Sequence, residues 1–279
     1  MLKYAKYEIK ETYRYILGVL ALVLILTTAL YVYFNRVDDT GEMSALGGMF
    51  TALSVLILFG TALATFLYIV GSFRKELYED RGYLTFTLPL TGNQIVGSKL
   101  MVASLWFIVL GVAIGLYNII MILMFVPIDI DADILEIFTR LFDITSIRNI
   151  LFFVLSFILN IVNMLVIIYF SMAISRVTFK NKRIGSLWFI IFLVLSALIG
   201  FGTVKVAELL PYYIDLNTFK IGSMDKLGQF YLEINNSNLI LSANTGFLIT
   251  NIAGLLFIIA VTVLLFLGTG YLIDRKIDL

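Results

Sequence analysis

The chain has 279 residues, of which 61% are hydrophobic and 14% are charged, and its formal net charge is +1. This composition leaves too little polar surface for a water-soluble globule, so it excludes an ordinary soluble domain. The chain contains no cysteine and no histidine, which excludes disulfides, thiolate or imidazole metal sites and the commonest general base. We therefore expect a membrane protein with no catalytic residue, no metal site and no cofactor bound by the chain itself.

Six stretches contain no Asp, Glu, Lys or Arg, and each is long enough for a helix to cross a hydrocarbon core of about 30 Å. They cover residues 15–35, 43–73, 100–128, 149–175, 184–204 and 234–273. The sequence predicts one all-α integral membrane domain over residues 1–279. Its six transmembrane helices are expected at about 15–35, 47–72, 99–126, 149–175, 184–204 and 246–273.

The charged residues divide unevenly between alternate loops. The N-terminus, the second and fourth loops and the C-terminal tail hold 14 basic and 7 acidic residues, whereas loops one, three and five hold 6 basic and 12 acidic residues. Basic loops stay on the cytoplasmic side, so both termini are expected inside the cell and the protein in its plasma membrane. The first span is expected to be retained, because it ends in bulky Tyr31, Tyr33 and Phe34 and lacks a small-residue cleavage site.

Residues 1–14 carry a basic amphipathic pattern in which apolar residues recur every three or four positions beside a stripe of cations. The apolar residues are Leu2, Ala5, Ile9 and Tyr13, and the cations are Lys3, Lys6, Lys10 and Arg14. A helix of this kind can lie in the headgroup layer with its cations near anionic lipid. A charged flank that only follows the positive-inside rule explains the pattern equally well.

The segment at residues 73–98, between the second and third spans, has the clearest local signals. Arg74–Arg81 is rich in helix formers and is followed by Gly82, a suitable C-cap. Thr91 and Gln94 then fit a capping box, which would start a helix that leads into the third span. We expect a short helix and a re-entry at the membrane surface here.

Polar residues inside the spans have two interpretations, helix packing and a translocation route. They are Thr51, Ser54, Thr61 and Thr65 in the second span and Asn160 and Asn163 in the fourth. Gly111 and Gly115 in the third span have the spacing that lets membrane helices approach closely. Helix packing is the default interpretation for the small residues, whereas the two amides should face other helices or a water-accessible seam.

The external loops give weaker signals. Five carboxylates between residues 129 and 143 lack the glycine and glutamate that an EF-hand requires, so we interpret them as solvated. The loop at residues 205–245 is expected to be structured. Gln229–Ile234 and Asn238–Ser242 flank Asn235–Ser237, which predicts a small β-hairpin.

The chain has no evident energy source of its own. Its spans contain no carboxylate or histidine of the kind that ion-driven carriers keep within the membrane. Its nearest approach to a phosphate-binding loop, residues 92–99, has the lysine one position too late. If the protein transports, ATP must be hydrolysed by another polypeptide.

The topology and the second loop together resemble the permease subunits of type-2 ATP-binding-cassette exporters. The loop reads Glu-Leu-Tyr-Glu-Asp-Arg-Gly-Tyr-Leu-Thr-Phe-Thr-Leu-Pro-Leu from residue 76 to residue 90. The positions that match the family pattern are Glu79, Arg81, Gly82, Leu84, Leu88, Pro89 and Lys99. The topology covers the whole chain, while the motif covers only residues 73–99.

The resemblance implies a dimer with a second copy or a sister permease, standing on a cytoplasmic ATPase dimer that holds ATP and Mg²⁺. Membrane lipid is the other expected partner, and nucleic acid is not expected. The residues implied in coupling to the ATPase are Arg74, Glu76, Glu79, Arg81, Gly82, Tyr83, Leu84 and Pro89. The expected function is export of an amphiphilic or peptide-like substrate, and the alternative is a non-transporting membrane scaffold or channel-like subunit.

Overall fold

The computed structural model describes residues 2–40, 45–78, 90–125, 144–178, 187–215, 221–223, 239–241 and 248–276. Six long helices dominate these residues. They are α1 (Leu2–Thr40), α2 (Ala45–Tyr78), α4 (Gly92–Phe125), α6 (Ile144–Thr178), α7 (Leu187–Leu209) and α8 (Ile252–Arg275). Each helix contains a segment that is long and apolar enough to cross a membrane, which gives the chain the architecture of a multi-pass membrane protein.

The sequence explains where several helices start and stop. The chain has three prolines, and Pro89, Pro127 and Pro211 all fall between helices in the sequence. A proline inside a helix removes a backbone hydrogen bond and clashes with the preceding turn, so its absence from the spans keeps them continuous. Apolar side chains on nearly all faces suit helices whose surroundings are hydrocarbon.

The boundaries of α1 and α8 differ from those expected, whereas the start of α4 agrees with the prediction. The N-terminal segment and the first span form one continuous helix, α1, rather than an interfacial helix followed by a separate span at residue 15. Helix α4 begins at Gly92, directly after the expected capping box at Thr91, and continues through residue 99 into the third span as expected. Helix α8 begins at Ile252, later than the expected residue 246, because Leu248–Asn251 form a strand.

The chain is not entirely helical, because a four-stranded antiparallel sheet caps one end of α7 and α8. Its strands are β1 (Tyr212–Asp215), β2 (Ile221–Ser223), β3 (Leu239–Leu241) and β4 (Leu248–Asn251), in the order β2-β1-β4-β3. Strand β1 follows α7 and strand β4 leads into α8, and Tyr213 pairs with Asn251. Part of the expected hairpin, residues 239–241, is therefore a strand whose partner is β4. The other arm, residues 229–234, lies outside the described residues.

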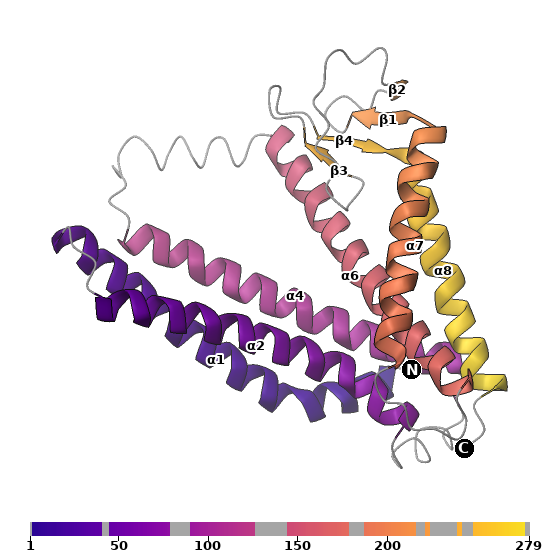
Figure 1. Ribbon diagram of the computed structural model, residues 1–279, viewed down its shortest axis with the longest axis horizontal. Helices are drawn as coiled ribbons and strands as arrows, with labels where there is room; N and C mark the ends of the chain where they lie inside the picture. Colours follow the sequence, from indigo (N-terminus) through magenta and orange to yellow (C-terminus); the bar gives the residue numbers. More distant parts are fainter. Residues whose placement is uncertain are drawn as a thin grey trace.

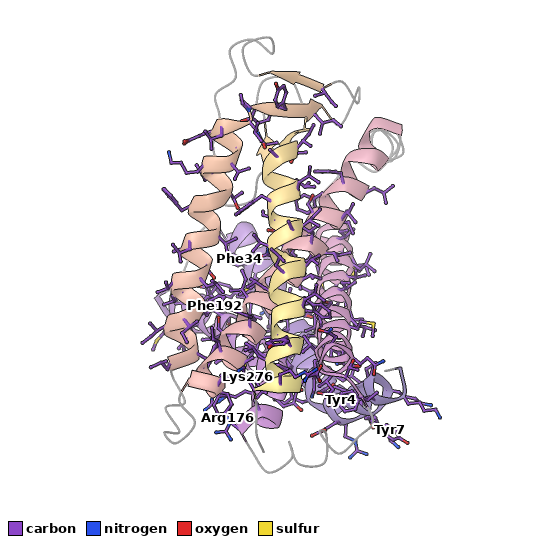
Figure 2. All side chains as sticks on the ribbon, turned by 90° about the vertical axis from the view of Figure 1, so that its right-hand side faces the viewer. Tyr4, Tyr7, Phe34, Arg176, Phe192 and Lys276 are labelled. Carbon is purple, nitrogen blue, oxygen red and sulfur yellow. The ribbon has the colours of Figure 1, made fainter. Side chains whose placement is uncertain are left out.

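The six helices form two groups that meet at one end of the molecule and diverge from it (Figure 1). Helices α1, α2 and α4 form one group, and helices α6, α7 and α8 form the other. Both chain termini lie at the end where the groups meet (Figure 1). Tyr4, Tyr7, Arg176 and Lys276 lie at this same end (Figure 2).

Buried side chains concentrate where the two groups meet. We call this region the joint, and it contains the hydrophobic core of the described residues. The joint core comprises Ala5, Ile16, Ile69, Val70, Phe73, Leu77, Val96, Val102, Ala103, Trp106, Leu165, Ile168, Tyr169, Met172 and Ile273. These residues come from α1, α2, α4, α6 and α8, so five helices are packed together at one end only. Farther from the joint, large side chains such as Phe59, Leu116 and Leu198 are exposed, as lipid-facing residues would be.

Candidate functional site: a buried polar joint beside an apolar groove

A buried ion pair lies at the centre of the joint and connects three helices. Lys99 of α4 places its Nζ atom 2.7 Å from Oε1 of Glu8 on α1, and the two side chains are only 4% and 10% exposed. Lys99 also donates a hydrogen bond of 2.7 Å to Oγ of Ser72 on α2, and Ser72 donates to Glu8. The ring of Tyr4 lies 5.8 Å from Lys99 Nζ, within cation–π range. The ammonium group of Lys99 and the carboxylate of Glu8 therefore neutralise each other and share the hydroxyl of Ser72. Buried ions are stable only when they are paired in this way.

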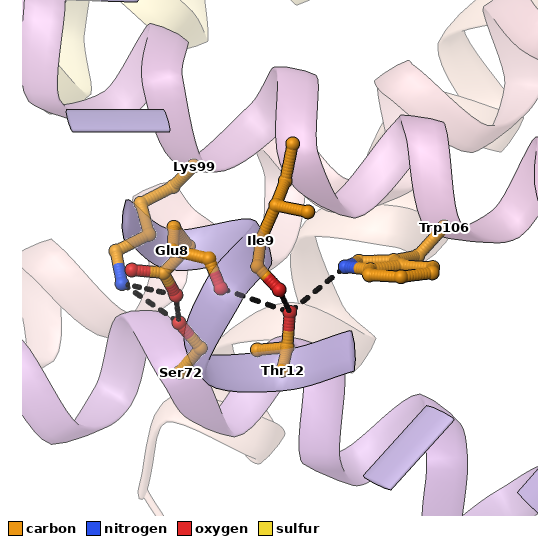
Figure 3. Close-up of polar contacts among 6 residues, drawn as sticks. All are labelled: Glu8, Ile9, Thr12, Ser72, Lys99 and Trp106. Carbon is orange, nitrogen blue, oxygen red and sulfur yellow. Dashed lines mark hydrogen bonds and ion pairs between the residues drawn. The ribbon is translucent and has the colours of Figure 1, made fainter. Parts of the chain in front are cut away.

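A second set of hydrogen bonds continues from the ion pair along α1 (Figure 3). Trp106 of α4 donates from Nε1 to Oγ1 of Thr12 over 2.9 Å, and both residues are buried. Thr12 in turn donates to the backbone carbonyl of Glu8 over 2.9 Å. Helices α1 and α4 are therefore joined at two levels, one turn apart on α1, by an ion pair and by an indole–hydroxyl hydrogen bond.

The start of α4 explains why Lys99 is buried. The expected capping box is present: Thr91 donates from its amide to Gln94 Oε1 over 3.2 Å, and the Gln94 amide donates to Thr91 Oγ1 over 3.4 Å. The helix starts at Gly92, so Lys99 lies two turns inside α4, where α1 and α2 pack against it. The amide of Gly92 donates to Oδ1 of Asp274 over 2.6 Å, which places a carboxylate at the positive end of the helix dipole.

The close approach of α4 and α8 depends on glycine. A Cβ atom on Gly92 would overlap the backbone carbonyl oxygen of Gly270, and a Cβ on Gly270 would overlap Oδ1 of Asn93. No other residue type fits either position without displacing one of the helices. In the joint, α4 and α8 are therefore in backbone contact, with no room for a side chain at either glycine.

The end of α2 is attached to α6 in the same region. Tyr78 donates from its hydroxyl to the backbone carbonyl of Met172 over 3.1 Å, and the guanidinium of Arg176 lies 5.7 Å from the Tyr78 ring. Phe73 and Tyr169 pack with ring centroids 4.3 Å apart. Residues 79–89 connect α2 to α4. The residue before them, Tyr78, is hydrogen-bonded to α6, and Gly92, at the start of the next helix, is hydrogen-bonded to α8.

An apolar groove of about 800 Å³ opens on the other side of the joint, between α1, α2 and α4. Its lining residues are Val19, Leu20, Val23, Thr27, Leu30, Tyr31, Phe34, Leu58, Ala62, Thr65, Phe66, Phe107, Leu110, Gly111, Ile114, Asn118 and Phe157. The volume lies within the usual range of small-molecule sites. The same two helices that residues 79–89 connect, α2 and α4, provide more than half of this lining.

The four polar residues of the second span differ in burial and in whether they line the groove. Thr65 is buried, lines the groove and donates to the carbonyl of Thr61 over 2.7 Å. Thr61 donates to the carbonyl of Leu58 over 2.9 Å. Ser54 is buried and Thr51 is half-buried, and neither lines the groove. Of these four residues, only Thr65 therefore lines the groove.

The two asparagines of the fourth span and the two glycines of the third span make different contacts. Asn163 donates to Oγ1 of Thr262 on α8 over 2.8 Å, so it links two helices of the second group. Asn160 is exposed and donates to the carbonyl of Ser156 on its own helix. Gly111 and Gly115 have open space where a Cβ would be, so their spacing does not serve helix packing within the described part of this chain.

Most of the residues expected to couple to an ATPase lie outside the described residues. These are Glu79, Arg81, Gly82, Tyr83, Leu84 and Pro89. Arg74 and Glu76 lie in the last turns of α2, and the Arg74 side chain is exposed at the end of the molecule that holds both termini. The expected short helix between residues 74 and 81 is thus continuous with α2 as far as Tyr78.

The sequence analysis missed the joint network. Glu8, Ser72 and Trp106 were not singled out, and Lys99 was considered only in the rejected phosphate-binding loop and in the family resemblance. One signal was available: Glu8 is four residues from Thr12 on the same side of the N-terminal helix as Ala5, the side opposite to the basic stripe. A partner ninety-one positions away cannot be inferred from that spacing.

No group of three or more metal-ligating side chains occurs among the described residues. No protein family, curated protein or solved structure matches the chain.

Proposed function

We propose that the chain is the transmembrane permease subunit of an ATP-driven exporter in the plasma membrane. It works with a second permease copy or a sister permease and with a cytoplasmic ATPase dimer, which binds ATP and Mg²⁺. The excess of basic residues in the N-terminus, the second and fourth loops and the C-terminal tail supports placing both termini in the cytoplasm. The ATPase would then meet the end of the molecule where the joint lies.

One observation supports this proposal most strongly. Residues 79–89 connect α2, which is hydrogen-bonded to α6 through Tyr78, to α4, which is hydrogen-bonded to α8 through Gly92. A force applied to this segment therefore acts on both helix groups at once. A segment that serves only as a connector has no need of bonds to both groups at its two ends.

The groove supplies the second part of the argument. Helices α1, α2 and α4 belong to one helix group, and Phe157 of α6 is the lining residue that comes from the other. A rotation of one group against the other would therefore move Phe157 relative to the rest of the lining and change access to the groove. The joint has many packed and hydrogen-bonded contacts and would act as the pivot. The far ends of the helices, which are exposed in this chain, would move most.

The test is co-purification in mild detergent of the tagged chain with an ATP-binding-cassette ATPase encoded beside it. We expect a stable complex with vanadate-sensitive ATP hydrolysis, and no hydrolysis by the isolated chain. Glu79→Lys and Arg81→Glu should lose the ATPase while the chain still reaches the membrane, because reversed charges at an interface oppose docking.

Lys205→Glu is the matched control for these charge reversals. Lys205 is exposed on α7, and its ion pair with Glu208 contributes little to stability because both side chains are more than half exposed. It lies near the sheet, away from the joint. Normal ATPase binding by Glu79→Lys and Arg81→Glu would contradict the proposal and favour a membrane scaffold, as would an isolated chain that hydrolyses ATP.

A further inference from the structure

The groove has a lining without charge. Of its seventeen described residues, Thr27, Tyr31, Thr65 and Asn118 have polar side chains, and none is Asp, Glu, Lys or Arg. A phosphate or carboxylate held in such a site would lack a cation or an array of donors to replace its water. The chemistry of the lining therefore selects an uncharged occupant.

The groove is also long. Its lining on α1 runs from Val19 to Phe34, a distance of about 22 Å for fifteen rises of 1.5 Å each. A lipid chain in one leaflet extends through half of the hydrocarbon core, about 15 Å. The groove can thus hold an extended alkyl chain along its whole length, and an apolar space of this kind binds apolar groups in preference to water.

The groove offers hydrogen-bonding groups at the end far from the joint. Tyr31 donates from its hydroxyl to Oδ1 of Asn118 over 3.4 Å, and Asn118 donates to the carbonyl of Ile114 over 2.8 Å. At the end nearer the joint the lining is Val19, Phe66, Phe107 and Thr65, whose hydroxyl donates to the carbonyl of Thr61 on its own helix. A ligand with an alkyl chain and an uncharged polar group would place the polar group beside Tyr31 and Asn118.

We propose that this groove binds the alkyl chain of an uncharged single-chain amphiphile, with its hydroxyl groups at Tyr31 and Asn118. This assignment rests on the proposed function, because it names the class of substrate that the exporter would move. The binding step itself requires neither the ATPase nor the partner permease. Binding and export can therefore be tested separately.

The experiment uses the purified full-length chain in detergent and a monoacylglycerol that carries a photoreactive diazirine in its alkyl chain. After illumination, the labelled residues are identified by mass spectrometry. We expect labelling to concentrate on groove residues of α1, α2 and α4, and an excess of unlabelled monoacylglycerol to remove it. A phosphatidylglycerol at the same alkyl-chain concentration should compete much less, because its phosphate has no partner in the lining.

Two substitutions on α4 provide a matched pair. Gly111 lines the groove, Gly115 lies one turn farther along and does not, and both positions have open space where a side chain would begin. Gly111→Phe should lower labelling about tenfold or more, because its ring takes the place of several methylene groups of the ligand. Gly115→Phe should leave labelling unchanged.

Three results would overturn this assignment. They are labelling spread evenly over all lipid-facing helices, equal competition by phosphatidylglycerol, and equal loss of labelling in Gly111→Phe and Gly115→Phe. If labelling fails while the ATPase still binds the chain, the assigned substrate class is wrong, but the proposed exporter function is not contradicted. If labelling succeeds and no ATPase binds, the groove is a ligand site in a protein of another function.

Discussion

The joint and the groove share α1, α2 and α4 but are built in opposite ways. At the joint, the charged side chains of Glu8 and Lys99 are buried and paired, and helices approach as closely as glycine allows. In the groove the walls are apolar, and Gly111 faces open space. Closely packed, fully bonded regions resist deformation, whereas regions with few contacts open at low free-energy cost. The difference indicates a molecule fixed at one end and adaptable along the rest.

The largest expected effect comes from breaking the ion pair of the joint. Lys99→Met leaves the carboxylate of Glu8 buried without its cation, which should lower the free energy of unfolding by about 3–5 kcal/mol. Glu8→Gln combined with Lys99→Met removes both charges and should recover most of that loss. Circular dichroism during denaturation in mixed micelles measures both variants. Equal destabilisation by the single and double variants would show that the charge pair is not what holds the joint.

Adding a single methyl group should change the free energy of unfolding differently in the joint and in the groove. Gly270→Ala places a Cβ against Asn93 in the joint, and we expect a loss of about 1–3 kcal/mol from overpacking. Gly111→Ala adds the same methyl group to open space in the groove and should be neutral or slightly stabilising, since alanine favours helix. The same denaturation assay compares them, and similar losses in both would remove the distinction between the two regions.

The ends of α7 and α8 that lie far from the joint are also held together, by hydrogen bonds of Asn251. Asn251 is buried, its Oδ1 accepts the amide of Gly254 at 2.7 Å, and its Nδ2 donates to the carbonyl of Leu210 at 3.2 Å. Asn251→Ala should cost about 1–2 kcal/mol through loss of the cap. Asn251→Asp keeps the cap acceptor but not the amide donor, so thermal unfolding should place it between the wild type and Asn251→Ala. An aspartate no better than alanine would argue against the capping role.

The smallest effect is expected for the indole hydrogen bond. Trp106→Phe keeps an aromatic ring but loses the donor to Thr12, and the expected cost is about 0.5–1.5 kcal/mol. Thr12→Val removes the acceptor of the same bond. If the bond matters, the double variant should lose less than the sum of the two single variants, which a double-mutant cycle of unfolding free energies measures. Full additivity would mean that the bond contributes nothing.

The sequence predicted the local features of this fold better than the distant ones. The capping box of Thr91 and Gln94 and the six apolar helices depend on residues within a few turns of each other, and the structure contains both. The late start of α8 depends on β4 pairing with β1, residues some thirty-five positions earlier in the chain. The sequence predicted a strand at Asn238–Ser242 in the same charge-free run but assigned residues 248–251 to the sixth span. Buried pairs such as Glu8 with Lys99 likewise depend on how the helices pack.

The candidate site shows the same limit. Thr65 was selected as an intramembrane polar residue and does line the groove, but Thr51, Ser54 and Thr61 share its helical face and do not. Which part of a polar stripe lines a cavity is decided by how α1, α2 and α4 pack around it, and helical periodicity does not encode that packing. The roles of Glu79 and Arg81 in coupling remain predictions from the resemblance.

The central claim is that the two helix groups move about the joint when the ATPase acts, and distances between spin labels test it most directly. The chain has no native cysteine, so pairs can be introduced at Ile119 and Leu209, in the outer parts of α4 and α7, and at Lys6 and Lys276 beside the joint. We predict that the distance from Ile119 to Leu209 changes between the ATP-free and vanadate-trapped complexes, while the distance from Lys6 to Lys276 does not. An unchanged Ile119–Leu209 distance, or an equal change at both pairs, would contradict the account.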